Sequence, residues 1–196
     1  MPVPYLGGGV YGGVQTLPGC ARVLAIYTEP YTSDTRAPVE VREIDLPSQA
    51  RALTALSRVD YTDCFILESA RVRDRTGVEW ARALLEEAPS GTQDTLRRGW
   101  RALGVRLGST ADDRLVLGWL VRSSSPDFAL LGAKSVFGME AEVLIKREPN
   151  GVLAATLMKF NNPLVRIFWA GFSFQHRRIL RHLLVEAGRR ANAATS

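Results

Sequence analysis

A single histidine lies in the middle of the apolar face of a predicted helix near the C-terminus. Residues 161–190 predict one long helix, because Asn162 can accept a hydrogen bond from a free amide of the first turn and Pro163 suits the first helical position. Imidazole donates or accepts a proton near neutral pH, so His176 could serve aldol, dehydration or isomerisation chemistry on a carbonyl compound. At about 100° per residue, the face that carries His176 also carries Val165, Phe168, Trp169, Phe172, Ile179, Leu180, Leu183 and Ala187.

A second interpretation of His176 stays open. A lone histidine on an apolar face is more often a core residue whose ring is hydrogen-bonded to a backbone carbonyl or a hydroxyl group, and burial by itself points to function only statistically. A carboxylate that orients the ring would favour the acid–base role. Asp63 and Glu68 lie on opposite faces of a predicted strand, so one of them could face inward, and the sequence does not say which. His182 falls on the polar side of the helix, where exposure is expected.

The segments before this helix predict an antiparallel sheet and two shorter helices. Alternation of apolar and charged residues is clearest over 139–148, and the Asn-Gly pair at 150–151 is typical of a tight hairpin turn. A capping box, Thr76 with Glu79, predicts a helix start. Strands are expected over 39–46, 60–72, 114–122, 127–137, 139–148 and 152–160, and helices over 48–56, 76–88 and 93–107.

The charged residues of the strands predict which side chains face the long helix. With Lys134 and Lys159 in water, alternate positions along both strands point inward. The wall of a cavity between sheet and helix is then apolar with a few polar points, as small-molecule pockets are. The expected ligand-binding residues are Ser135, Thr156, Trp119, Met158, Phe172 and Phe137, with His176 as the acid or base. Glu140 and Glu142 are expected on a solvated face by the same alternation.

The order of elements resembles the helix-grip fold of the START and Bet v 1-like (SRPBCC) superfamily, which includes polyketide cyclases. The segments "DYTDCF", "LGWLV", "GMEAEVLIKRE" and "NNPLVRIFWAGFSFQHRRILRHLL" are similar to a bacterial family of unknown function within it, over residues 39–190. The resemblance implies an α+β fold in which a curved antiparallel sheet wraps around a long C-terminal helix, with two shorter helices after the first strand. It supplies no chemistry, because one fold hosts many functions.

Composition and charge narrow the function classes. The net charge is +5, because 25 lysines and arginines exceed 20 aspartates and glutamates. Only Lys134, Lys146 and Lys159 are lysines, so the positive charge comes mainly from arginine. The arginines are scattered, so arginine-rich composition is a simpler explanation than nucleic-acid binding. No window approaches the roughly 20 apolar residues of a membrane span. Cys20 and Cys64 fit no metal motif or disulfide framework, so a reducing, cytoplasmic location is expected.

The first 37 residues differ from the rest. They are rich in glycine and proline, so we expect a flexible extension over 1–37, a domain over 38–192 and a short tail over 193–196. "GGGVYG" at 7–12 matches a dinucleotide fingerprint without the flanking strand and helix, and "LPGC" at 17–20 lacks the features of a signal peptide. We therefore expect no cofactor and no metal, and find no nucleophile elbow or phosphate loop.

Three functions remain from the sequence. The first is binding of a small hydrophobic molecule with cofactor-free cyclase, dehydratase or isomerase chemistry at His176. The second is a non-catalytic binder or carrier of a hydrophobic metabolite or lipid. The third is a structural or interaction module whose cavity is filled. The sequence does not identify the ligand or the oligomeric state.

Overall fold

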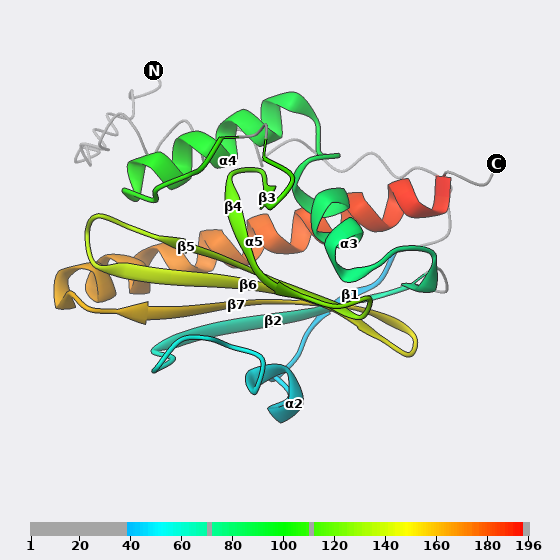
Figure 1. Ribbon diagram of the computed structural model, residues 1–196, viewed down its shortest axis with the longest axis horizontal. Helices are drawn as coiled ribbons and strands as arrows, with labels where there is room; N and C mark the ends of the chain where they lie inside the picture. Colours follow the sequence, from blue (N-terminus) through cyan, green and yellow to red (C-terminus); the bar gives the residue numbers. More distant parts are fainter. Residues whose placement is uncertain (1–38, 70–71, 110–111, 194–196) are drawn as a thin grey trace, which may run out of the picture. The chain divides into compact units, whose positions relative to one another are not determined.

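The structure, a computed structural model, describes residues 39–69, 72–109 and 112–193. The predicted extension over 1–37 and the last three residues of the predicted tail lie outside this part of the chain. The described residues form an α+β fold with an antiparallel sheet and a long C-terminal helix, as expected (Figure 1). The elements are β1 (Val41–Glu43), α2 (Ser48–Arg51), β2 (Tyr61–Glu68), a 3-10 turn (Val72–Asp74), α3 (Gly77–Leu85), α4 (Ser90–Ala102), β3 (Leu115–Val116), β4 (Trp119–Ser124), β5 (Phe128–Lys134), β6 (Met139–Glu148), β7 (Gly151–Phe160) and α5 (Pro163–Ala193).

The seven described strands form one open sheet in the order β1-β2-β7-β6-β5-β4-β3. Strands β3 to β7 follow one another as a meander, and β2 then pairs with β7 along its whole length. A tight turn connects β6 and β7 as predicted, but its two residues are Pro149 and Asn150, because Gly151 already belongs to β7 and pairs with Glu148. The pairing of β2 with β7 brings residues about 90 positions apart in sequence to the same row of the sheet, for example Asp63 opposite Thr156.

The prediction of one strand over 114–122 is wrong, because a tight turn divides it. Leu117 and Gly118 both have positive φ, 48° and 92°, and join β3 to β4 as a two-residue hairpin loop. The next predicted strand, 127–137, ends early at Lys134, and residues 135–138 form the β5–β6 turn with Gly138 at φ 86°. Ser135 and Phe137 therefore lie in a turn and not in the strand, so the prediction that they face inward by strand alternation is wrong.

The helices form where they are predicted, but α2 ends at Arg51 instead of 56 and α4 ends at Ala102 instead of 107. Helix α3 has the predicted capping box, with both Thr76–Glu79 hydrogen bonds present. Helix α4 begins at Ser90, three residues before the predicted start, and the chain leaves it at Gly104, whose φ is 67°. Trp100 of α4 packs edge-to-face on Trp119 of β4, with 5.4 Å between ring centroids.

Helix α5 and α3 cover one face of the sheet (Figure 1). The predicted inward residues of β5 and β7, such as Leu131 and Ala154, are buried against this layer. Leu183 of α5 is buried as expected, whereas Val165 and Phe172 are half-buried. Phe168 differs from the prediction because it is half exposed at the N-terminal end of α5.

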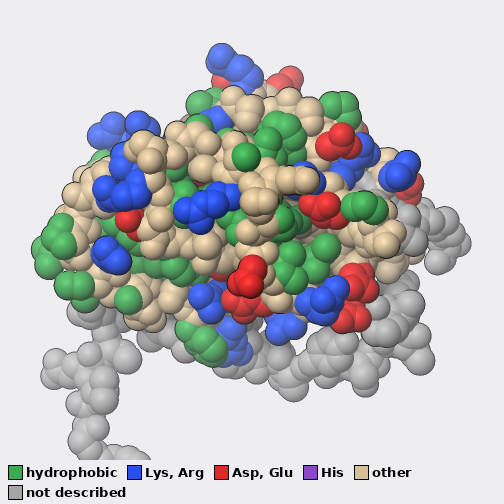
Figure 2. All heavy atoms as spheres, turned by 90° about the horizontal axis from the view of Figure 1, so that it is seen from below, with side chains coloured by type: hydrophobic (Ala, Val, Ile, Leu, Met, Phe, Trp, Pro, Cys, Tyr) green, Lys and Arg blue, Asp and Glu red, His purple; other side chains and the backbone are tan. Residues whose placement is uncertain are grey.

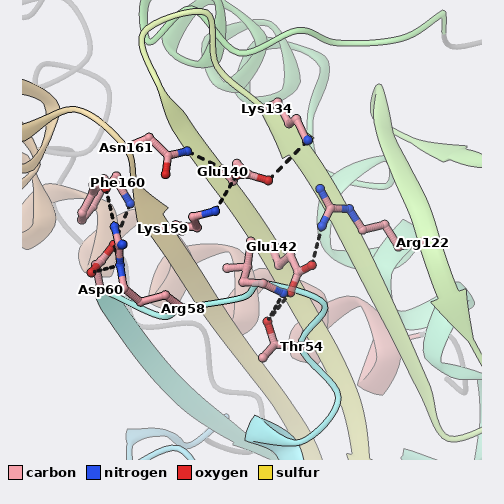
Figure 3. Close-up of polar contacts among 11 residues, drawn as sticks. Thr54, Arg58, Asp60, Arg122, Lys134, Glu140, Glu142, Lys159, Phe160 and Asn161 are labelled. Carbon is pink, nitrogen blue, oxygen red and sulfur yellow. Dashed lines mark hydrogen bonds and ion pairs between the residues drawn. The ribbon is translucent and has the colours of Figure 1, made fainter.

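The opposite face of the sheet is also covered, so the prediction that it is solvated is wrong. The segment 44–59, which contains α2, packs over a second apolar cluster that includes Leu130, Leu144 and Leu157. Glu142 lies on this face and its side chain is fully buried. The Nη1 of Arg122 donates to its Oε1 at 2.6 Å, and Thr54 Oγ1 and the Ala55 amide donate to its Oε2 at 2.5 and 3.2 Å (Figure 3). Alternation identified the face of Glu142 correctly but not the segment that covers it.

Candidate functional site

Three elements bring a polar cluster together around His176. Asp63 of β2 and Thr156 of β7 are opposite each other in the sheet, so both side chains point to the face that α5 covers. The ring nitrogen Nε2 of His176 lies 3.0 Å from Thr156 Oγ1 and 3.4 Å from Asp63 Oδ2. The first distance is a hydrogen bond, and the second is an ion-pair distance. The carboxylate that the sequence left undecided is therefore Asp63, since Glu68 is exposed and pairs with Arg42.

Asp63 is a buried carboxylate with an incomplete set of partners. Tyr61, two residues earlier on the same face of β2, donates its hydroxyl to Asp63 Oδ2 at 2.6 Å. Burial, and then the neighbouring Asp63, raise the pKa of Tyr61, so the phenol stays neutral and remains a donor. Arg177 of α5 donates from Nε to the Tyr61 hydroxyl at 3.5 Å. Asp63 Oδ1 is buried and has no hydrogen-bond partner among the described residues.

The environment of His176 favours a neutral imidazole. Burial lowers its pKa below the ordinary value; Asp63 opposes this effect and Arg177 adds to it. Trp169 covers one side of the ring, with 5.1 Å between ring centroids, and 21% of the side chain remains accessible. A carboxylate beside Nε2 favours the tautomer with its proton on that nitrogen, which leaves Nδ1 as the acceptor. Nδ1 has no hydrogen-bond partner within the described part of the chain, so the arrangement can accept a proton there.

The other predicted site residues are not gathered around His176, apart from Thr156. Ser135 donates its hydroxyl to the Leu103 carbonyl at 2.6 Å and accepts from the Phe137 amide at 3.0 Å, so it stabilises the β5–β6 turn. Trp119 is buried beside Trp100, and its indole nitrogen has no partner among the described residues. Met158 is buried in the sheet–helix core. Phe172 packs between Trp169 and Phe168 on α5.

An apolar pocket of about 320 Å³ lies at the N-terminal end of α5. The end of α4, the β5–β6 turn and the first two turns of α5 form its walls. Of the predicted ligand-binding residues, Phe137 lines this pocket, and His176 is separated from it by Trp169, which contacts both. The described residues that line the pocket are Ala102, Leu103, Phe137, Met139, Asn162, Leu164, Val165, Phe168 and Trp169.

The sequence analysis left Asp63 undecided against Glu68 and missed Tyr61 and Arg177 as parts of the cluster. Arg177 is half exposed and also pairs with Glu43 at 3.2 Å. The signal that could have found Asp63 is the pairing of β2 with β7. This pairing joins distant segments, and the strand pattern "YTDCFILE" is apolar on both faces.

Comparisons with protein families, with characterised proteins and with solved structures give no match to this chain. Within the described residues, no three His, Cys, Asp or Glu side chains lie together as a metal site would require. A membrane-crossing helix is likewise not found there, because none of the described helices is both long and apolar enough.

Proposed function

We propose that this protein binds a small apolar molecule in the pocket at the N-terminal end of α5. One observation carries the proposal: among the described residues that line about 320 Å³ of space, Asn162 alone is polar. A volume of this size is at the lower end of the range for small-molecule sites, which are concave, mostly apolar and equipped with few polar groups. Asn162 uses its amide in local bonds, donating to the Phe137 carbonyl and accepting from the Leu164 amide, so it shapes the pocket wall.

The same arrangement supports a finer assignment of the fold. A long C-terminal helix on one face of an antiparallel sheet, with two helices after β2, is what the helix-grip fold of the START and Bet v 1-like superfamily requires. In our proposal the chain is a divergent relative of that superfamily. The open pocket argues against the third function from the sequence, an interaction module with a filled cavity.

The binding proposal is tested by fluorescence titration with 1-N-phenylnaphthylamine, a neutral apolar probe. Ala102→Phe places a ring in the pocket, where it takes space that the probe needs. The affinity of this variant for the probe should fall at least tenfold, roughly the effect of one apolar group of the probe that is no longer buried. Ala170→Phe is the matched control, since Ala170 is exposed on α5 and does not line the pocket. Its affinity should stay within about twofold. Absence of saturable binding, or equal binding by both variants, would reject the proposal.

A second candidate function is acid–base chemistry at His176, favoured by the position of Asp63 beside Nε2. We propose that Nδ1 accepts a proton from a carbonyl compound while Asp63 stabilises the imidazolium that forms. For a compound in the pocket to reach the imidazole ring of His176, the side chain of Trp169 would have to move aside, because it lies between the two.

The chemistry is tested with a panel of ketones and β-hydroxy carbonyl compounds. Replacing His176 with Asn should lower turnover by about 10²–10⁴-fold, the usual contribution of a general acid or base. His182→Asn is the matched control, because His182 is exposed on the same helix. Turnover that survives in His176→Asn would remove His176 from the mechanism, and absence of turnover in the wild type would leave the protein as a binder.

A further inference from the structure

The first half of α5 is apolar on its outer face as well as its inner face. Leu164, Ile167 and Phe174 recur at helical spacing and are 71%, 70% and 69% exposed. Beside them, Phe168 of the same helix and Val136 and Phe137 of the β5–β6 turn are 50%, 56% and 54% exposed. These six residues form what we call the α5 apolar surface. This surface adjoins the pocket, since three of its residues, Phe137, Leu164 and Phe168, also line the pocket.

The surroundings of this surface are basic. The segments 95–109 and 161–185, which contain most of α4 and the first two-thirds of α5, have no Asp or Glu. Figure 2 shows Lys and Arg side chains beside hydrophobic ones at the left-hand end, where Figure 1 places the start of α5 and the β5–β6 turn. The arginines of the two segments are Arg97, Arg98, Arg101, Arg106, Arg166, Arg177, Arg178 and Arg181.

Most of these arginines are available to an anionic partner. Arg98, Arg101, Arg106, Arg166 and Arg178 are exposed, and none of them forms an ion pair of 4 Å or less within the described part of the chain. The guanidinium of Arg178 lies 5.9 Å from the centre of the Phe174 ring, so charge and apolar side chain are presented together. A surface with this composition fits a partner that offers hydrocarbon and negative charge side by side.

We propose that the α5 apolar surface docks onto the surface of an anionic phospholipid bilayer. Ile167, Phe174 and Leu164 enter the boundary between headgroups and acyl chains, as the apolar face of an interfacial helix does. The arginines remain at the level of the lipid phosphates, which their guanidinium groups bind well. The pocket then opens toward the acyl chains. The docking does not depend on whether the pocket holds a ligand, so it stands or fails separately from the proposed function.

The exposed side chains favour lipid over nucleic acid. Single-stranded nucleic acids use aromatic rings on which bases stack, between basic residues that follow the backbone. Here the most exposed residues include Leu164 and Ile167, which have no ring, and they continue into an apolar pocket that hydrocarbon can reach. Hydrocarbon accepts the aliphatic and aromatic side chains equally, and the phosphates of the headgroups supply the negative charge.

The experiment is co-sedimentation of the full chain with vesicles. Vesicles of phosphatidylcholine with 30 mol% phosphatidylglycerol should bind the protein, and vesicles of phosphatidylcholine alone should bind it at least tenfold more weakly. The double variant Ile167→Gln/Phe174→Gln should lose binding at least tenfold, because two exposed apolar groups no longer enter the bilayer. Arg101→Gln should lose about fivefold, the usual contribution of one basic residue near an anionic membrane, and less at high salt.

Leu120→Gln is the matched control, since Leu120 is 47% exposed on β4 and lies outside the α5 apolar surface. It should bind vesicles as the wild type does. Ile167 and Phe174 do not line the pocket, so the double variant should retain binding of 1-N-phenylnaphthylamine even if docking is lost. Three results would overturn the proposal. The first is that the wild type does not bind vesicles, and the second is that it binds a single-stranded oligonucleotide more tightly than anionic vesicles. The third is that the wild type self-associates through this surface, as shown by loss of self-association in the double variant, and does not bind vesicles.

Discussion

Glu142 provides a sharp test of the packing on the second face of the sheet. Its side chain is fully buried, and it accepts from Arg122, Thr54 and the Ala55 amide. Glu142→Ala leaves the Arg122 guanidinium without its anion while 21% of that side chain is exposed. Removing one partner of a buried pair costs about 3–5 kcal/mol, and partial exposure of Arg122 places the expected loss near 3 kcal/mol.

The assay is urea unfolding followed by circular dichroism. Glu140→Ala is the matched control, because Glu140 lies on the same face of β6 two residues earlier and pairs with Lys134 and Lys159 at 3.4 and 3.2 Å nearer to solvent. It should lose about 1 kcal/mol or less. Amide hydrogen exchange over 44–59 should accelerate in Glu142→Ala and stay unchanged in the control. Equal losses of stability in the two variants would refute the buried network.

Three further predictions concern other elements. Burial lowers the pKa of His176 in the folded protein, so the unfolded chain binds a proton at this histidine more readily. The stability of the fold should therefore decrease as the pH drops below about 6.5. Thermal melts at pH 7 and pH 5 should show this decrease in the wild type and in His182→Asn, and a smaller decrease in His176→Asn. Gly77→Ala should cost about 1–3 kcal/mol in urea unfolding, because a Cβ there overlaps the backbone of β5, whereas Gly91→Ala, which has open space, should be neutral or stabilising. Thr76→Ala should cost about 1 kcal/mol by removing the capping box of α3, and a loss below about 0.3 kcal/mol would contradict that role.

Much of the fold follows from local patterns in the sequence. Asn162 and Pro163 marked the start of α5, Thr76 and Glu79 marked α3, and Lys159 gave the facing of β7 and so placed Thr156 toward the helix. These features depend on neighbours within a few residues, where spacing alone determines direction.

The remainder depends on contacts between distant segments. Asp63 could be chosen over Glu68 only once β2 was paired with β7, and Glu142 became buried only because 44–59 folds over it. Leu117 gave no warning of a positive φ, since leucine disfavours that conformation and Gly118 alone carried the turn signal. Phe168 was assigned to the inner face by helical spacing, but α5 extends past the sheet–helix core at its N-terminal end.

The most direct test of ligand binding uses the methionines. The chain has three: Met139 lines the pocket, Met158 lies in the sheet–helix core, and Met1 is outside the described residues. Titration of ¹³C-methyl-methionine protein with 1-N-phenylnaphthylamine should shift the Met139 methyl resonance saturably and leave that of Met158 nearly unchanged. A shift of Met158 without Met139 would place the ligand elsewhere in the core, and no shift of either at saturating probe would contradict binding in the pocket.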